Sequence, residues 1–112
     1  MLNISTQNIY IYQSPVNMHK SFDGLQGIVE RFFPDKLFTH SLFVFVNRQR
    51  DKMKIFYWDE DGLCFWYKRL EKGSFKVDTN GKTELSRREF LMLLEGIKPQ
   101  YLNKRYSMRK SA

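Results

Sequence analysis

The apolar residues in the first third of the chain repeat with the period of an α-helix. Between residues 18 and 33 they follow one another at spacings of three and four, which places them along one side of a helix. Asn17 is a suitable residue to begin this helix, and Pro34 ends it. The sequence therefore predicts an amphipathic helix over residues 18–33, with the apolar stripe Phe22, Leu25, Ile28, Val29, Phe32 and Phe33.

A second amphipathic helix is predicted over residues 86–97. Ser86 and Glu89 have the spacing of a capping box, in which each side chain accepts a hydrogen bond from the backbone N–H of the other residue. Lys98 and Pro99 end the helix. Its buried stripe is predicted to be Phe90, Leu91, Leu93, Leu94 and Ile97.

Runs of β-branched and aromatic residues between the two helices, and one before them, predict strands. Residues 8–13 alternate as in a short strand, and the continuous apolar run at residues 41–47 suits a strand that is covered on both faces. Residues 53–58 and 63–70 predict a β-hairpin, because the acidic and glycine-containing segment 59–62 between them has the composition of a turn.

This turn fixes the pairing of the hairpin, and with it the composition of each face. The predicted pairs are Trp58 with Leu63, Phe56 with Phe65, and Lys54 with Tyr67. One face then carries Met53, Ile55, Tyr57, Cys64, Trp66 and Lys68, and the other carries Lys54, Phe56, Trp58, Leu63, Phe65, Tyr67 and Arg69. The second face combines aromatic rings with cations, which suits the stacking of bases and the neutralisation of phosphates. The alternative is that it packs against the remaining strands or against a second subunit.

The last predicted strands lie between the hairpin and the second helix. Residues 75–77 are short and extended, and Asn80-Gly81 predicts a tight turn that returns through residues 83–85. The order of elements indicates an α+β fold, with a single antiparallel β-meander sheet and two amphipathic helices on one face. We expect one globular domain over residues 1–98, followed by a basic C-terminal tail over residues 99–112.

Composition excludes several classes of protein. The chain has 112 residues, the length of one domain, and its ten Phe, six Tyr and two Trp can still build a substantial core. No apolar run approaches the ~20 residues that cross a bilayer, and the N-terminus lacks the pattern of a signal peptide. The single Cys64 cannot form an intramolecular disulfide, which fits a reducing compartment. We therefore expect a cytoplasmic protein that does not enter the membrane.

The net charge of +7 lies entirely in the second half of the chain. Residues 1–47 carry equal numbers of cations and acids, whereas residues 48–112 carry sixteen Lys and Arg against nine acids. An excess of this kind predicts a polyanionic partner, and DNA is the expected one. The residues predicted to contact nucleic acid are Arg48, Arg50, Lys52, Lys54, Lys68, Arg69, Lys104, Arg105, Arg109 and Lys110. A well-solvated surface with a frayed end is the alternative.

The sequence offers little catalytic or metal-binding chemistry. Asp59 and Asp61 precede Gly62 and are interpreted as turn residues, because no other acid has a spacing that would complete a metal site. His19 and His40 lack neighbouring ligands at zinc-site spacing. No phosphate-binding glycine loop or serine nucleophile motif occurs. We therefore expect no enzyme activity, no cofactor and no metal ion.

Three segments resemble one family of transposable-element proteins. MHKSFDGL from Met18, LFVFVNRQRDKMKIFYWDEDGLCFWYKRLEKGSF, and LLEGI resemble the TnpB accessory proteins, encoded by the second open reading frame of insertion-sequence sixty-six type bacterial elements. The resemblance covers residues 9–98 and is most specific from Lys52 to Phe75, while the tail after Pro99 matches only in being basic. It implies a non-catalytic helper of a separate, larger transposase, and it supplies no catalytic residue.

Two functions from different classes follow. The first is a DNA-binding accessory factor that holds element ends or target DNA with its basic half. The second is a protein adaptor that binds the transposase or the element's other accessory protein without touching DNA. The aromatic residues on both hairpin faces favour the adaptor, since Trp, Tyr and Arg are preferred anchors of protein interfaces.

Overall fold

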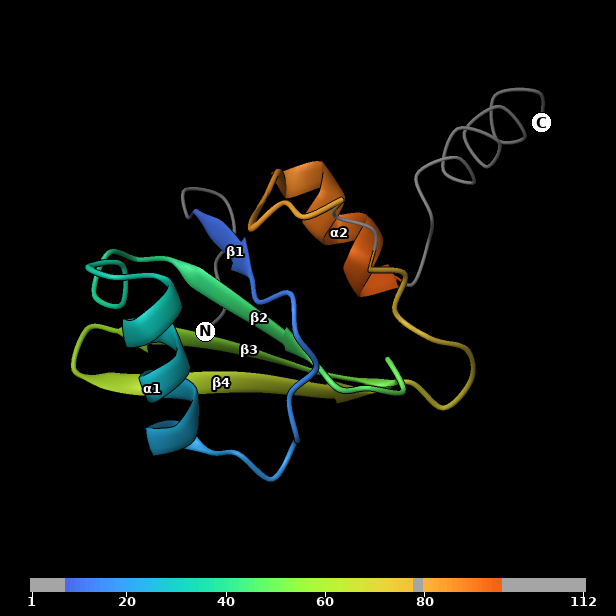
Figure 1. The fold of residues 1–112 in the computed structure, drawn as a ribbon, viewed down its shortest axis with the longest axis horizontal. Helices are drawn as coiled ribbons and strands as arrows, with labels where there is room; N and C mark the ends of the chain where they lie inside the picture. The colour runs from blue at the N-terminus through green and yellow to red at the C-terminus, as the bar shows by residue number, and fades with distance from the viewer. Residues whose placement is uncertain (1–7, 78–79, 96–112) are drawn as a thin grey trace.

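The computed structural model describes residues 8–77 and 80–95, which form a five-stranded sheet with one helix against each face (Figure 1). The strand order in the sheet is β4-β3-β2-β1-β5. The elements are β1 (Ile9–Ile11), α1 (Phe22–Phe32), β2 (Leu42–Val46), β3 (Lys52–Asp59), β4 (Gly62–Arg69), β5 (Glu84–Leu85) and α2 (Arg87–Glu95). No helix within the described ranges is long and apolar enough to cross a membrane.

The predicted hairpin is present as β3 and β4, in the predicted register. Trp58 pairs with Leu63, Phe56 with Phe65, and Lys54 with Tyr67. The four residues of the acidic segment form the tip of the hairpin, where Asp59 and Gly62 are the last pair. Side chains therefore alternate between the two faces as the sequence predicted.

The sheet is mostly antiparallel, which confirms an α+β fold, but it is not the predicted antiparallel meander. Ile9 pairs with Leu42 in a parallel arrangement of β1 and β2. The chain joins these two strands through α1, because parallel neighbours need a long crossover rather than a tight turn. The returning arm of the predicted Asn-Gly hairpin also has a different partner. It is β5, and it pairs with β1, where Ile9 lies opposite Leu85.

The prediction that both helices lie on one face is also wrong. α1 packs on the face of Phe43, Phe45 and Phe56, whereas α2 packs on the opposite face, against residues such as Val44 and Ile55. The physical reason lies in β2, where all five residues are buried. A strand that is apolar on both sides needs a cover on both sides, and one helix supplies each.

The two helices begin differently. Ser86 and Glu89 form the predicted capping box: the Glu89 N–H donates to Ser86 Oγ at 3.1 Å, and the Ser86 N–H donates to Glu89 Oε1 at 2.9 Å. α1 begins at Phe22 rather than directly after Asn17. The Asn17 side chain accepts instead from the His19 N–H at 2.8 Å, in a turn that precedes the helix.

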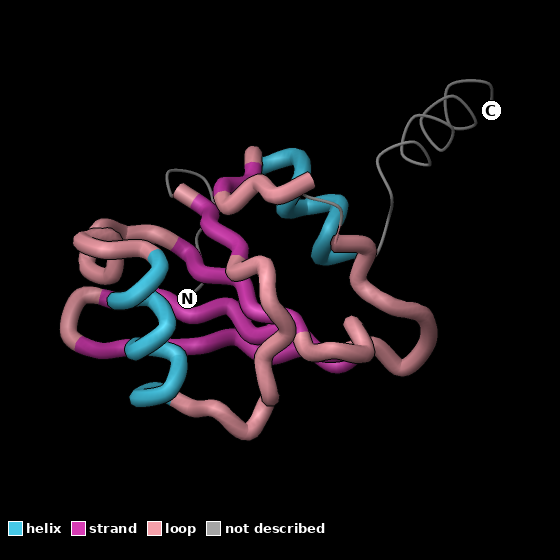
Figure 2. The backbone as a smooth tube through the Cα atoms, in the orientation of Figure 1, coloured by secondary structure: helices cyan, strands magenta, loops and turns pink. Residues whose placement is uncertain are grey.

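The connection from β1 to α1 is a long loop that lies over the sheet. Residues 12–21 cross the sheet as loop before α1 begins (Figure 2). Val16 N–H donates to the Val46 carbonyl at 3.0 Å, which ties this connection to the end of β2. The predicted end of α2 near Ile97, the domain boundary at residue 98 and the basic tail 99–112 lie outside the described residues.

Candidate nucleic-acid interface

The loop between β2 and β3 is organised by the buried side chain of Asn47. Asn47 Oδ1 accepts hydrogen bonds from the backbone N–H groups of Asp51 at 3.1 Å and Lys52 at 3.0 Å. Its Nδ2 donates to Gln49 Oε1 at 3.2 Å and to Asp51 Oδ1 at 2.7 Å. These four bonds hold the loop in one shape, so its exposed cations are presented on a fixed backbone.

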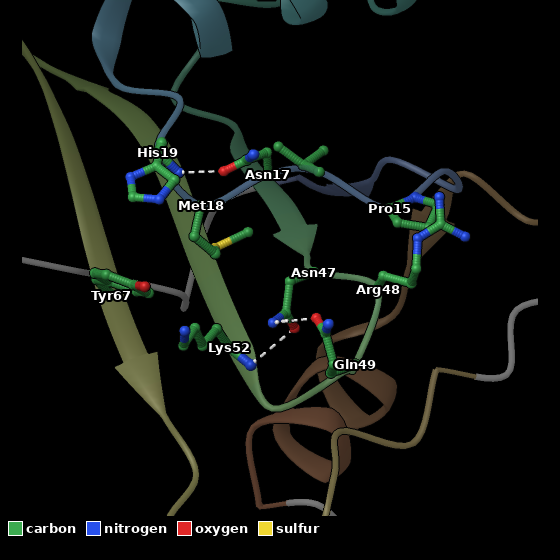
Figure 3. Close-up of a pocket in the computed structure, with 10 residues that line it drawn as sticks. Pro15, Asn17, Met18, His19, Asn47, Arg48, Gln49, Lys52 and Tyr67 are labelled. Atoms are coloured by element: carbon green, nitrogen blue, oxygen red, sulfur yellow. Dashed lines mark hydrogen bonds between the residues drawn. The ribbon is translucent and has the colours of Figure 1, made fainter.

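An open groove of about 640 Å³ lies beside this loop (Figure 3). One wall comes from residues 15–19 of the β1–α1 connection, and the other from the β2–β3 loop with the adjoining ends of β3 and β4. The lining residues include the cations Arg48 and Lys52 together with His19, and they include no carboxylate. The groove is therefore suited to an anion, because no acid competes for its positive charge.

Tyr67 gives this groove an aromatic surface. Its side chain is 48% exposed, and it lines the groove from β4 (Figure 3). The ammonium group of Lys54 lies 5.0 Å from the centroid of the Tyr67 ring. A half-exposed ring next to cations can stack against a planar group of a ligand.

Lys54, which the sequence predicted as a nucleic-acid contact, is buried with 4% of its surface exposed. Its Nζ donates to the backbone carbonyls of Met18 at 2.7 Å and Lys20 at 2.8 Å, and it lies 4.6 Å from the centroid of the Phe65 ring. Burial lowers the pKa of this amine. The side chain therefore fastens the groove wall to the sheet, and we do not count it among the phosphate contacts.

The other predicted contacts are spread over different surfaces. Lys68 is on the α2 face, where its Nζ donates to the Leu94 carbonyl at 3.3 Å. Arg69 is exposed and pairs with Glu71 at 3.0 Å, and this hydrogen bond raises the pKa of the guanidinium. Exposed Arg50 lies in the loop but does not line the groove, and its guanidinium reaches the Val77 carbonyl at 3.4 Å. Of the described candidates, only Arg48 and Lys52 line this groove.

Four of the predicted contacts belong to the C-terminal segment. Lys104, Arg105, Arg109 and Lys110 lie outside the described residues. Across residues 8–77 and 80–95 there is no group of three or more His, Cys, Asp or Glu that could hold a metal ion.

Sequence reasoning missed the contribution of the β1–α1 connection to this site. His19 and Asn17 line the groove, although neither had a sequence neighbour that pointed to a ligand. Their position depends on the hydrogen bonds from Lys54, which lies more than thirty residues further along the chain. No local pattern could reveal that contact.

Comparisons with known proteins show which family and which curated protein the chain resembles. The family described as IS66 Orf2 like protein matches residues 7–104. An uncharacterized protein, y4jC, from Sinorhizobium fredii (strain NBRC 101917 / NGR234) is 28% identical over 91 residues, covering 80% of this chain and 78% of that protein. No solved structure matches the chain at a significant level.

Proposed function

Since the chain belongs to the IS66 Orf2 like family, which implies an accessory protein associated with transposition, we propose that it acts by binding DNA. In this proposal the protein is non-catalytic and helps a separate transposase by holding the DNA of the element ends or of the target. The contacts are made to the phosphate backbone by the cations of the β2–β3 loop.

The observation that carries this proposal is the groove in which Arg48 and Lys52 meet without any lining carboxylate. The one acid of the loop, Asp51, accepts a hydrogen bond from Asn47 and does not line the groove. Phosphate groups that enter this groove therefore meet the cations Arg48 and Lys52 and no lining carboxylate. Phosphate contacts supply most of the affinity of non-specific DNA binding.

The rigidity of the loop also favours this use. Four hydrogen bonds of the Asn47 side chain fix the backbone that carries the exposed Arg48 and Arg50. A charged side chain on an already ordered loop loses less conformational entropy on binding than one on a loop that must first become ordered. Because phosphate contacts carry no base information, we expect similar affinity for element ends and for unrelated duplexes.

One observation favours the adaptor as a second candidate. Phe38 is 61% exposed, and its ring lies edge-on against Trp58, with 4.9 Å between the ring centroids. Trp58 is six residues from Lys52 along β3, which corresponds to about 20 Å at the rise of a strand. The exposed ring of Phe38 and the partly buried ring of Trp58 could together anchor the transposase or the element's other accessory protein, on a surface separate from the loop.

A binding titration at two salt concentrations tests the proposal. Duplex element ends and a random duplex of equal length are titrated with the protein, and both affinities are expected to fall steeply and in parallel as salt rises. The exposed-ring variant Phe38→Ser is the matched control and is expected to bind DNA as the wild type does. If the protein does not bind duplex DNA at low salt, and Phe38→Ser no longer captures the transposase, the DNA-binding proposal is wrong and the adaptor function is favoured.

A further inference from the structure

A second groove, of about 350 Å³, runs along α1. It shares Pro15, Val16 and Asn17 with the groove beside the β2–β3 loop, so the two grooves meet at this part of the β1–α1 connection. Its own cations are Lys20 and Arg31. No carboxylate lines the second groove either, although α1 carries Asp23 and Glu30.

The surface of α1 in this groove is open at Gly27, which has no side chain. Gly24 and Gly27 both line the groove. A Cβ atom added at Gly27 would meet no atom within 4 Å, whereas one at Gly24 would lie 3.3 Å from the side chain of Lys20, which covers that position. A ligand can therefore approach the backbone of α1 between the two cations.

Each groove also contains one half-exposed aromatic ring beside a cation. Phe32 is 48% exposed, with the guanidinium carbon of Arg31 5.3 Å from its ring centroid. Tyr67 is equally exposed in the other groove and lies 5.0 Å from the ammonium of Lys54. A positive groove with aromatic rings at intervals is the composition of surfaces that bind single-stranded nucleic acid.

We propose that the two grooves form one continuous track for a single strand of nucleic acid, which crosses the molecule at residues 15–17. This inference rests on the proposed DNA-binding function and names its substrate class. Arg31 and Lys20 hold phosphates on the α1 side, and Arg48 and Lys52 hold them on the loop side. The rings of Phe32 and Tyr67 stack on unpaired bases, whose faces a duplex would not offer.

Gly27 allows a direct test, because a Cβ atom added there meets no atom within 4 Å. Gly27→Glu places a negative charge in the α1 groove, and Gly27→Gln adds a side chain of the same size without the charge. Binding is measured by fluorescence anisotropy with a labelled oligothymidine of about 15 nucleotides and with a duplex hairpin carrying the same number of phosphates. Thermal unfolding and circular dichroism establish that every variant is folded.

We expect Gly27→Glu to bind the oligothymidine about tenfold more weakly than Gly27→Gln, and to bind the duplex about as Gly27→Gln does. Tyr67→Leu is expected to weaken binding of the single strand by about tenfold, as the loss of one stacked base would. Equal affinities of the Glu and Gln variants for the single strand would overturn the track. An equal loss of affinity for the single strand and for the duplex would also overturn the track, because it would mean that α1 contacts a duplex.

The outcomes also separate this inference from the function on which it rests. If the wild-type protein binds the duplex with steep salt dependence, and the two Gly27 variants bind the single strand equally well, the proposed function is supported and the track is refuted. A wild-type protein that binds neither ligand at low salt removes both.

Discussion

The side-chain amide of Asn47 donates a hydrogen bond of 2.7 Å to the carboxylate of Asp51. This pair controls the charge that the β2–β3 loop presents, because Asp51 is the one acid among its cations and does not line the adjoining groove. The same asparagine accepts from the backbone N–H groups of Asp51 and Lys52. One buried amide therefore orders the loop and supplies a hydrogen bond to its single acid.

Removing this amide is expected to weaken both the fold and the binding. Asn47→Ala leaves the backbone N–H groups of Asp51 and Lys52 without their acceptor, at a cost of about 1–3 kcal/mol in the free energy of unfolding. Urea denaturation measures this loss. Affinity for duplex DNA should fall as well, since the loop cations lose their fixed backbone. The exposed Thr83→Ala, outside this loop, is the control, and an Asn47→Ala protein as stable as this control would contradict the account of the loop.

Lys54 is expected to be a structural lysine. Lys54→Met leaves the carbonyls of Met18 and Lys20 without their donor, and we expect a loss of about 1–3 kcal/mol in the free energy of unfolding. The exposed Lys72→Met serves as the control. If Lys54→Met retains full stability but loses DNA affinity, this lysine contacts DNA after all.

The same residue predicts a pH dependence. Burial lowers the folded-state pKa of Lys54 below its ordinary value of 10.5, so between these two pKa values the unfolded chain binds more protons than the folded chain. Stability from this group therefore rises with pH up to about 10.5. Urea denaturation from neutral to alkaline pH should show this rise in the wild type relative to Lys54→Met. Parallel curves for the two proteins would contradict it.

The capping box of α2 predicts sensitivity to acid. Hydrogen bonds from the Ser86 backbone and from Lys82 lower the pKa of Glu89 below its ordinary value of 4.5. The stabilisation is therefore complete above pH 4.5 and is lost as the pH falls through the folded-state pKa.

Ser86→Ala should cost about 1 kcal/mol in the free energy of unfolding at neutral pH, whereas Ser86→Asn should retain the cap. Equal unfolding midpoints of these two variants would remove the capping box as a source of stability.

The basic C-terminal segment is expected to add affinity rather than stability. Deleting residues 99–112 removes Lys104, Arg105, Arg109 and Lys110. If these cations contact phosphates, the deletion lowers DNA affinity and reduces the steepness of its salt dependence by about one unit per lost contact. The melting temperature should change little. A large fall in melting temperature would show that the segment belongs to the folded domain and would move the predicted boundary at residue 98.

Local sequence patterns predicted both helices and most of the strands, because their causes are local, but residues 75–77 form no strand. The Ser86–Glu89 spacing located the start of α2, and the alternation around the acidic turn gave the register in which Trp58 faces Leu63. The pattern at Ile9–Ile11 indicated a strand but carried no information about its partner, so the parallel pairing with β2 was missed. The fully apolar β2 already required cover on both faces, which could have placed the helices correctly.

The candidate site was less predictable, because it depends on contacts between distant segments. Arg48 and Lys52 were predicted from the local density of charge. Their groove exists only because the β1–α1 connection crosses the sheet and Lys54 holds its residues 18 and 20. Lys20 and Arg31 were not predicted as contacts, because the first half of the chain has equal numbers of cations and acids and so no net charge.

The central claim is that the cations of the β2–β3 loop bind the phosphate backbone, and charge reversal tests it most directly. The triple variant Arg48→Glu, Arg50→Glu and Lys52→Glu is compared with a control that reverses three exposed cations elsewhere, namely Lys36, Lys72 and Arg87. Both variants change the net charge equally, and circular dichroism establishes that both are folded.

The decisive measurement is the affinity of each variant for duplex DNA as a function of salt. We expect the loop variant to bind element ends and random duplex equally weakly, with the salt dependence reduced by about one unit per lost phosphate contact. The control variant should lose much less affinity and keep the slope of the wild type. A folded loop variant that binds duplex DNA as tightly as the wild type at low salt would contradict the claim.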